Sequence, residues 1–282
     1  MNNDVVKIQA TPPETVPIPT TAFSESAETT VRWLTGSGFL INCRGTLILI
    51  DPVLTMKPGS QEICEIDMRL LRSFPIQVNE IPRLDAILYT HTDNDHLAPM
   101  TAQALIRTGG VFAGTAAVVS KLVSLHISKE QTQSMKIGET VTIGSVQITL
   151  TPADHPWQEI DPLQYGAPHG PEDCCGFLLH TPDGTIWLTG DTRLLPEHFD
   201  MGKVDALLLD VSDDPYHLRM DNEVRLANHY ASAQLIPHHY GTYDAPDLLP
   251  FNGDPALLAS RITGSERRLH ILAPGEEFVL RG

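Results

Sequence analysis

The stretch "YTHTDNDHLAP", residues 89–99, places two histidines and two aspartates within six positions, from His91 to His96. Imidazole and carboxylate side chains are common ligands of divalent metals. An apolar run at residues 86–89 precedes them, and a helical pattern over residues 97–107 follows. The pattern therefore indicates a buried strand that ends and enters a helix. Its polar residues form either a solvated loop or half of a metal site.

The rest of the chain predicts short strands and helices in two similar successions. The first has strands at 31–34, 38–42 and 46–50, then strand 86–89, helix 97–107, strand 111–113 and helix 115–125. The second has strands at 140–143, 146–151, 176–180 and 185–189, then strand 206–211, helix 221–230, strand 234–236 and a closing strand 278–280. Two such units predict an α/β fold with two sheets packed face to face and helices outside, a four-layer αββα sandwich.

Composition narrows the class of protein. Residues 1–28 contain Pro12, Pro13, Pro17 and Pro19, which predicts an extended N-terminal arm before a single domain at 29–282. The formal charge of −16 disfavours binding to nucleic acid. We expect no membrane span and no signal sequence, and the four cysteines lack zinc-ribbon or disulfide-scaffold spacing. The chain is therefore expected to be cytoplasmic, with reduced thiols and a possible homo-oligomeric state.

Three later strands also end at potential metal ligands. Strand 146–151 runs into His155, strand 185–189 into Asp191, and strand 234–236 into the pair His238-His239. Histidine occupies only 12 of 282 positions, so this repeated placement is hard to assign to chance. It favours a metal site over a solvated loop.

The order of these motifs resembles that of the metallo-β-lactamase superfamily of metal-dependent hydrolases. Its pattern is HxHxDH, then a lone His, an Asp in a "GD" turn and a final His. The corresponding stretches here are "HTDNDH", "DH" at 154–155, "TGDT" at 189–192 and "PHHYGT" at 237–242, and the resemblance covers about residues 31–280. The endings "HYGT" and "APGEEFVL" look most like the branch with the ascorbate-phosphate lactonase and the N-acyl-phosphatidylethanolamine phospholipase D.

The resemblance implies an αββα fold and a ligand set for two metals. The first metal would take His91, Asp93 and His155, and the second Asp95, His96 and His239, with Asp191 as a bridge. His239 is preferred because the family histidine immediately precedes the Tyr-Gly pair. His238 stays open as the alternative ligand.

Asp93 departs from the family pattern, which has a histidine there. A carboxylate is a harder donor than imidazole, so it shifts preference from zinc toward manganese or iron. Three readings remain open: a weak first site, a site for a different metal, or Asp93 as a partner to a metal-bound water.

Two divalent ions about 3.5 to 4 Å apart can share a hydroxide and polarise the bond to be broken. The predicted reaction is hydrolysis of an ester, lactone, amide or phosphodiester. Asp191 would orient the water, Asp95 would take or relay a proton, and Tyr240 would donate a hydrogen bond to an oxyanion.

Substrate contacts are predicted less sharply. Lys57 and Arg193 can receive an anionic group or be solvated surface cations. Trp157 can stack on a substrate or cover the pocket, and His169 can line it. The long loop at residues 156–171 is a candidate lid.

The predicted function is a binuclear hydrolase of a small, anionic lactone or phosphodiester. Its cofactors would be two Mn²⁺ or Zn²⁺ ions, or Fe²⁺. A metal-binding member without turnover is the alternative from a different class. A nuclease is disfavoured by the charge, and an electron-transfer diiron protein by the lack of room for a flavin domain.

Overall fold

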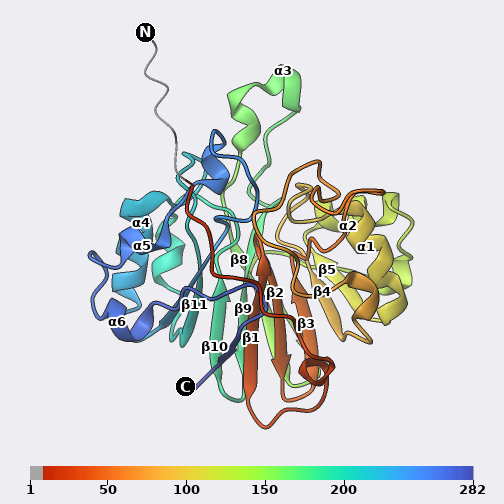
Figure 1. Cartoon of the computed structure of the whole chain (residues 1–282), viewed down its shortest axis with the longest axis horizontal. Helices are drawn as coiled ribbons and strands as arrows, with labels where there is room; N and C mark the ends of the chain where they lie inside the picture. The colour runs from red at the N-terminus through yellow and green to blue at the C-terminus, as the bar shows by residue number, and fades with distance from the viewer. Residues whose placement is uncertain (1–8, 282) are drawn as a thin grey trace.

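The computed structural model of the chain describes residues 9–281, and two β-sheets lie at its centre (Figure 1). The first sheet has seven strands in the order β13-β1-β2-β3-β4-β5-β6. Their bounds are β1 (Thr29–Thr35), β2 (Gly38–Cys43), β3 (Thr46–Ile50), β4 (Ala86–Leu88), β5 (Val111–Gly114), β6 (Thr132–Ser134) and β13 (Glu277–Val279).

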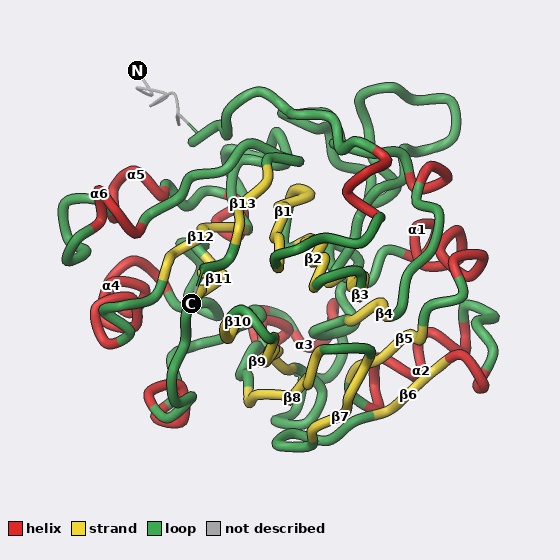
Figure 2. Tube along the Cα trace, turned by 90° about the horizontal axis from the view of Figure 1, so that it is seen from below, coloured by secondary structure: helices red, strands yellow, loops and turns green. Residues whose placement is uncertain are grey.

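The second sheet has six strands in the order β12-β11-β10-β9-β8-β7. Their bounds are β7 (Thr140–Ile143), β8 (Val146–Pro152), β9 (Cys175–Thr181), β10 (Gly184–Leu188), β11 (Ala206–Asp210) and β12 (Gln234–His238). Seen from below, the strands form two facing rows (Figure 2).

Helices cover the outer faces of both sheets. The first sheet carries α1 (Pro99–Leu105) and α2 (Ala116–Ser124), and the second carries α4 (Arg219–His229), α5 (Pro255–Leu258) and α6 (Ser265–Arg268) (Figures 1 and 2). A short helix, α3 (Pro162–Tyr165), projects from the top of the molecule in Figure 1. The predicted four-layer αββα sandwich is confirmed.

Buried apolar side chains hold the layers together. Aromatic residues from both sheets, among them Phe39, Phe177 and Trp187, are fully buried in one large cluster. A second cluster lies under α1 and α2 and includes Leu105, Val118 and Leu122. Strands β2, β3 and β4 are buried along their whole length, as expected for central strands covered on both faces.

Strand direction decides where the strand ends meet. In the first sheet, β3 runs parallel to β4; in the second, β10, β11 and β12 run parallel to one another. Strand β8 is antiparallel to β9, which is antiparallel to β10, so β8 also points the same way as β10. The residues that follow β8, β10, β11 and β12 are thus gathered at one edge of the second sheet.

Local signals account for the ends of the predicted helices. The predicted helix 97–107 begins as α1 at Pro99. Proline suits this position because a backbone N–H in the first turn would have no partner within the helix. The helix continues as a 3-10 turn at Ile106–Thr108. Gly109 then adopts a positive φ of 79° and ends it. Thr115 caps α2 through its side chain, which accepts a hydrogen bond from Val118 N. Strand β6 was not predicted because its sequence, TQS, is polar.

The described part of the predicted arm lies against the body of the protein. Between Gln9 and Glu28 it contains one 3-10 turn, Thr20–Phe23, whose Phe23 is buried. The Gln9 side-chain amide donates to the carbonyls of Tyr243 and Phe251, at 2.8 and 2.9 Å. Residues 1–8 lie outside the described residues, and the division into an arm and a domain stays a prediction. None of the helices within residues 9–281 is long and apolar enough to cross a membrane.

We expect Phe177→Ala to lower the free energy of unfolding by about 3 to 5 kcal/mol, because the ring is fully buried between the sheets and its loss leaves a cavity. Urea denaturation measures the change. Leu163→Ala, at a fully exposed position on α3, is the control and should change stability by less than about 0.5 kcal/mol. Equal effects would contradict the assignment of the core.

Candidate metal centre

Histidines and aspartates from distant parts of the chain meet at the edge where the strands end. They follow β4, β8, β10 and β12, as the parallel strand directions require. Six of the predicted ligands form two groups in which all donor atoms lie within 4.8 Å of one another. The first group is His91, His155 and Asp191; the second is Asp95, His96 and His239.

Asp191 lies at the middle of the cluster. Its Oδ2 atom is 3.0 Å from His96 Nε2, 3.3 Å from His239 Nε2 and 3.9 Å from His155 Nε2. The carboxylate is 3% exposed, so little water screens its charge. Burial opposes ionisation, but the imidazoles of His239 and His96 outweigh it and lower the Asp191 pKa well below its ordinary value. One carboxylate therefore touches both donor groups, as a bridging ligand would.

The donor atoms fit divalent cations. His91 Nε2 and Asp191 Oδ1 are buried, and neither has a hydrogen-bond partner among the described residues. Buried polar atoms normally have partners, so both atoms are suited to metal coordination. Burial lowers the His155 pKa to about 3, helped by the nearby His217, and His155 Nδ1 donates to the carbonyl of Tyr216 at 3.1 Å. His155 is therefore neutral at pH 7, with the Nε2 lone pair facing the cluster.

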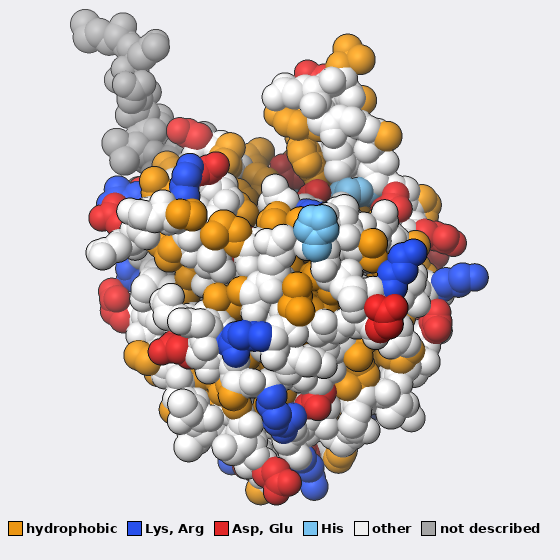
Figure 3. Space-filling view, turned by 90° about the vertical axis from the view of Figure 1, so that its right-hand side faces the viewer, with side chains coloured by type: hydrophobic (Ala, Val, Ile, Leu, Met, Phe, Trp, Pro, Cys, Tyr) orange, Lys and Arg blue, Asp and Glu red, His pale blue; other side chains and the backbone are white. Residues whose placement is uncertain are grey.

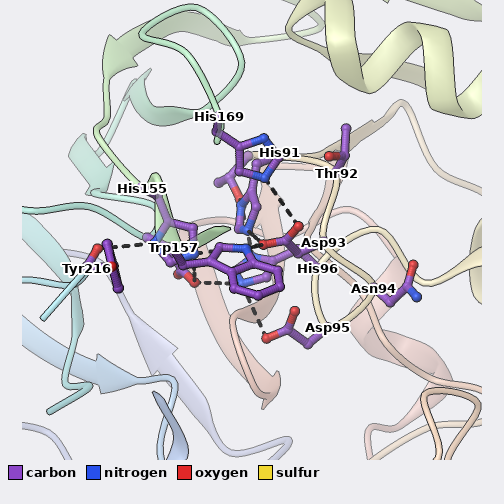
Figure 4. Close-up of polar contacts among 12 residues, drawn as sticks. His91, Thr92, Asp93, Asn94, Asp95, His96, His155, Trp157, His169 and Tyr216 are labelled. Carbon is purple, nitrogen blue, oxygen red and sulfur yellow. Dashed lines mark hydrogen bonds and ion pairs between the residues drawn. The ribbon is translucent and has the colours of Figure 1, made fainter. Parts of the chain in front are cut away.

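Asp93 stands beside the first group and is the acceptor for two side chains. Its Oδ2 atom lies 3.2 Å from His91 Nε2 and 3.8 Å from His155 Nε2. Trp157 Nε1 donates to Oδ2 at 2.6 Å, and His169 Nε2 donates to Oδ1 at 3.2 Å (Figure 4). Both hydrogen bonds occupy lone pairs of the Asp93 carboxylate that a metal ion would otherwise take. Asp93 as a ligand and Asp93 as an outer partner therefore both stay open as predictions.

Asp51, directly after β3, supports His96 from behind. Its Oδ2 accepts from His96 Nδ1 at 2.9 Å and from the Thr90 hydroxyl at 2.7 Å, while Oδ1 accepts from Thr90 N at 2.8 Å. This pairing fixes the tautomer of His96 so that Nε2 faces Asp191. Asp51 has a φ of +43°, an unusual conformation that the surrounding bonds hold in place. Sequence reasoning gave Asp51 no role at the site, although the residue directly follows the predicted strand 46–50.

His217 and Asp210 form a second buried pair that the sequence analysis missed. His217 Nδ1 lies 2.7 Å from Asp210 Oδ2, and His217 Nε2 lies 3.7 Å from Asp191 Oδ2. Asp210, His217 and His239 also form a third donor group. We interpret Asp210 and His217 as a hydrogen-bonded pair, because the Asp210 carboxylate already contacts His217 Nδ1. Asp210 carried the same signal as the predicted ligands, an acid at the end of a buried strand.

The two adjacent histidines of "PHHYGT" face opposite ways. His238, the last residue of β12, is fully buried, and its ring packs edge-on against Phe39 in the core. Burial lowers its pKa to about 4. His239 has a left-handed φ of +62°, and its Nδ1 lies 2.9 Å from the carbonyl of Pro250 while Nε2 faces Asp191. The geometry thus brings His239, and not His238, to the cluster.

Three predicted residues are not brought to the cluster. The Tyr240 ring stacks on Trp33 in the core at 5.3 Å, and its buried hydroxyl has no hydrogen-bond partner among the described residues. Lys57 pairs with Asp67, and the Arg193 Nε atom donates to Asp154 at 2.7 Å. These positions do not support an oxyanion donor at Tyr240 or an anion-binding role for the two cations.

Residues 156–171, the candidate lid, form a projecting flap. It contains a 3-10 turn, Trp157–Ile160, followed by α3, which projects from the top of the molecule (Figure 1). Trp157 and Ile160 line the same cavity as the donor residues. Trp157 and His169, at the two ends of the flap, both contact Asp93 (Figure 4). Two side-chain hydrogen bonds from the flap therefore end on one carboxylate at the edge of the cluster.

A comparison with protein families gives a match over the part of the chain that holds this cluster. Residues 46–240 match the β-lactamase superfamily domain, a span that runs from β3 to just past His239. The chain belongs to the metallo-β-lactamase superfamily. The αββα sandwich and the positions of the donor residues at strand ends agree with this membership.

Other proteins are similar to this chain over most of its length, at low sequence identity. A metal-dependent hydrolase of Pyrobaculum arsenaticum is 26% identical over 89% of this chain and 99% of its own length. A metal-dependent hydrolase of Anaeromyxobacter sp. strain K is 29% identical, covering 88% of this chain and 86% of its own. The crystal structure of a possible metal-dependent hydrolase from Veillonella parvula has a TM-score of 0.70 at 16% identity, covering 90% and 100% of the two chains.

We expect Trp157→Phe to weaken metal binding about tenfold, because it removes the indole donor from Asp93 while keeping an aromatic ring. Isothermal titration calorimetry with Mn²⁺ and Zn²⁺ measures the affinity. Tyr165→Phe is the matched control, since that ring lies 4.9 Å from the Trp157 ring, whereas the side-chain hydrogen bonds to Asp93 come from Trp157 and His169. An unchanged affinity in Trp157→Phe would contradict a role for the Trp157–Asp93 hydrogen bond in metal binding.

Glu223 on α4 gives a test of the electrostatics around Asp210. Burial, and then the charge of Asp210, raises the Glu223 pKa from 4.5 to about 9. The folded state therefore keeps a proton that the unfolded chain has lost, and this contribution to stability falls as pH rises from about 4.5 to about 9. Relative to the parent, Glu223→Gln should gain up to about 1.4 kcal/mol of stability per pH unit between about pH 5 and 8. Urea denaturation across that range measures it.

Glu266→Gln on α6 is the control for this series, because Glu266 is largely exposed. Its stability relative to the parent should not change with pH. A flat difference for Glu223→Gln as well would contradict a protonated buried acid.

Proposed function

We propose that this chain is a binuclear metal-dependent hydrolase that acts on a small molecule. One observation carries the proposal: the central carboxylate of Asp191 lies close to both groups of donors, and two of the buried donor atoms have no hydrogen-bond partner among the described residues. Membership of the superfamily and the names of the relatives, metal-dependent hydrolases, support it.

The residues of the chain divide the work. His91 and His155 would hold one ion and Asp95, His96 and His239 the other, with Asp191 between them. Asp51 and the carbonyls of Tyr216 and Pro250 fix the tautomers of three of these imidazoles, so their Nε2 atoms are oriented before any ion binds. Bound ions would lower the pKa of a water molecule toward 7 and polarise the bond under attack.

Asp95 is placed to move a proton. It lines the cavity above the cluster and is 22% exposed, whereas Asp191 is 3% exposed. Its Oδ2 atom lies 3.6 Å from His239 Nε2 and 3.8 Å from His96 Nε2, so the carboxylate reaches both the second group and the solvent. Asp95 can therefore take a proton from water and pass it to a leaving group.

The bond to be broken belongs to the lactone or phosphodiester class expected from the sequence. Mn²⁺, Zn²⁺ and Fe²⁺ remain the proposed ions, since Asp93 adds a hard oxygen donor to a site of imidazoles. The resemblance to the lactonase and phospholipase D branch, the cytoplasmic location and a homo-oligomeric state also remain predictions.

Asp191→Ala and His96→Ala should each reduce hydrolysis more than a hundredfold and lower the metal content, because each removes a shared or central donor. Elemental analysis should find two ions per parent chain. Rates are measured with a lactone panel and bis(4-nitrophenyl) phosphate, and circular dichroism checks folding.

His180→Ala is the matched control, an exposed histidine on β9 that hydrogen-bonds Thr185. It should keep the parent's rates and metal content. Unchanged hydrolysis in both Asp191→Ala and His96→Ala, or a single tightly held ion with no turnover, would refute the proposed function.

A further inference from the structure

The cavity above the metal centre has apolar walls. Its volume is about 510 Å³, within the range of small-molecule sites. Its floor holds Asp95, His155, Asp191 and His239. The apolar wall residues come from three separate segments: Ile66 and Met68, Trp157 and Ile160 of the flap, and Leu248, Pro250 and Phe251.

These walls begin at the metal centre itself. The Phe251 ring stacks on the His239 ring at 5.6 Å, and the Trp157 indole donates to Asp93. When the scissile bond of a substrate lies at the ions, its substituents must therefore extend along these apolar side chains. Burial of those substituents would be the main source of binding free energy.

The charges around the cavity offer no net attraction for an anion. Two divalent ions would add four positive charges, and four carboxylates line the cavity, those of Asp93, Asp95, Asp191 and Asp214. The two contributions balance in number. Within residues 9–281, no lysine or arginine is among the lining residues.

The nearby cations are already engaged. Lys57 and Arg193 pair with Asp67 and Asp154, as described above. Lys121 on α2 donates to the Thr92 carbonyl and, at 2.8 Å, to Asn94 Oδ1. It therefore holds the loop after β4 from the outer side and is not a lining residue.

We propose that the cavity binds uncharged esters or lactones that carry an apolar chain or ring. This inference rests on the proposed hydrolase function and narrows it, selecting the neutral carbonyl substrate over the anionic one and over the phosphodiester. The apolar part of the substrate lies between the flap and the segment 248–251, and the carbonyl faces the ions.

The exposed surface of the flap and the opposite rim supports an apolar occupant. Ile160 is 61% exposed and Leu248 is 48% exposed, although both line the cavity. Leu249 beside Leu248 is also exposed, and hydrophobic atoms mark the projecting flap in Figure 3. Apolar side chains gathered around a polar floor are typical of a binding site, since exposing them to water is unfavourable.

The test compares three 4-nitrophenyl esters on the metal-loaded chain: the acetate, the octanoate and the monoester of octanedioic acid, whose far end is a carboxylate. We expect kcat/KM to rise at least about tenfold from acetate to octanoate, as methylene groups become buried, and to fall by a similar factor for the carboxylate-ended ester. Calorimetric binding of octanamide and of the monoamide of octanedioic acid to the metal-loaded chain gives a readout that does not depend on ester hydrolysis.

A positive charge introduced into the apolar wall provides the second arm. Ile160→Lys should reduce or invert the preference for the neutral octanoate, because it places a cation on the wall. Leu163→Lys adds the same charge to the same flap at an exposed position that does not line the cavity, and should leave the preference unchanged.

Equal or better hydrolysis of the carboxylate-ended ester by the parent chain would overturn the inference while leaving the hydrolase assignment standing. The inference would also be overturned if Ile160→Lys and Leu163→Lys changed the preference for the neutral octanoate equally. If the metal-loaded chain hydrolyses neither the esters, nor the lactone panel, nor bis(4-nitrophenyl) phosphate, the proposed function fails. The two amides then decide the inference: tighter binding of octanamide supports it, and equal binding overturns it.

Discussion

Burial of the Asp191 carboxylate among four imidazole rings is the interaction on which the site depends. A carboxylate removed from water is costly unless opposite charge and hydrogen bonds compensate it. Without metal, the compensation comes from imidazoles: burial opposes a proton on His96 and His239, but the surrounding carboxylates raise both pKa values well above the ordinary one. Divalent ions would replace those protons at the same positions. The cluster is therefore built for positive charge whether protons or metals supply it.

The fold meets this demand through strand direction. Parallel β10, β11 and β12 end at one edge of the second sheet, and β4 brings the His91 loop to the same place from the first sheet. Each ligand thus lies in a segment that follows a strand. Because packing already orders the strand, less conformational entropy is lost in positioning the ligand. Asp51 and Asp210, which hydrogen-bond His96 and His217, also lie at the ends of buried strands. Asp51 follows β3, and Asp210 is the last residue of β11. One arrangement of strands supplies both the donors and their hydrogen-bond partners.

Much of this could be predicted from the sequence, because a strand that ends at a ligand is a local pattern. The αββα layers and the convergence of His91, His155, Asp191 and His239 followed from it. What the pattern missed depends on conformation or on distant partners. A left-handed backbone at His239 breaks the alternation of the strand and separates it from His238. His217 lies in an irregular segment, and its role depends on Asp210 seven residues earlier. Lys57 and Arg193 have acidic partners that only the folded chain reveals.

The two sides of the cavity are held in different ways. The wall that contains Pro250 and Phe251 is tied to the centre by His239 Nδ1 and from outside by the Gln9 amide, which also bonds Tyr243. The flap meets the centre through Asp93, which accepts from both Trp157 and His169. A displacement of the flap therefore changes the hydrogen bonds on a carboxylate beside the first donor group. Asp93, the residue that departs from the family pattern, thus connects the flap with the first donor group through hydrogen bonds on one side and His91 on the other.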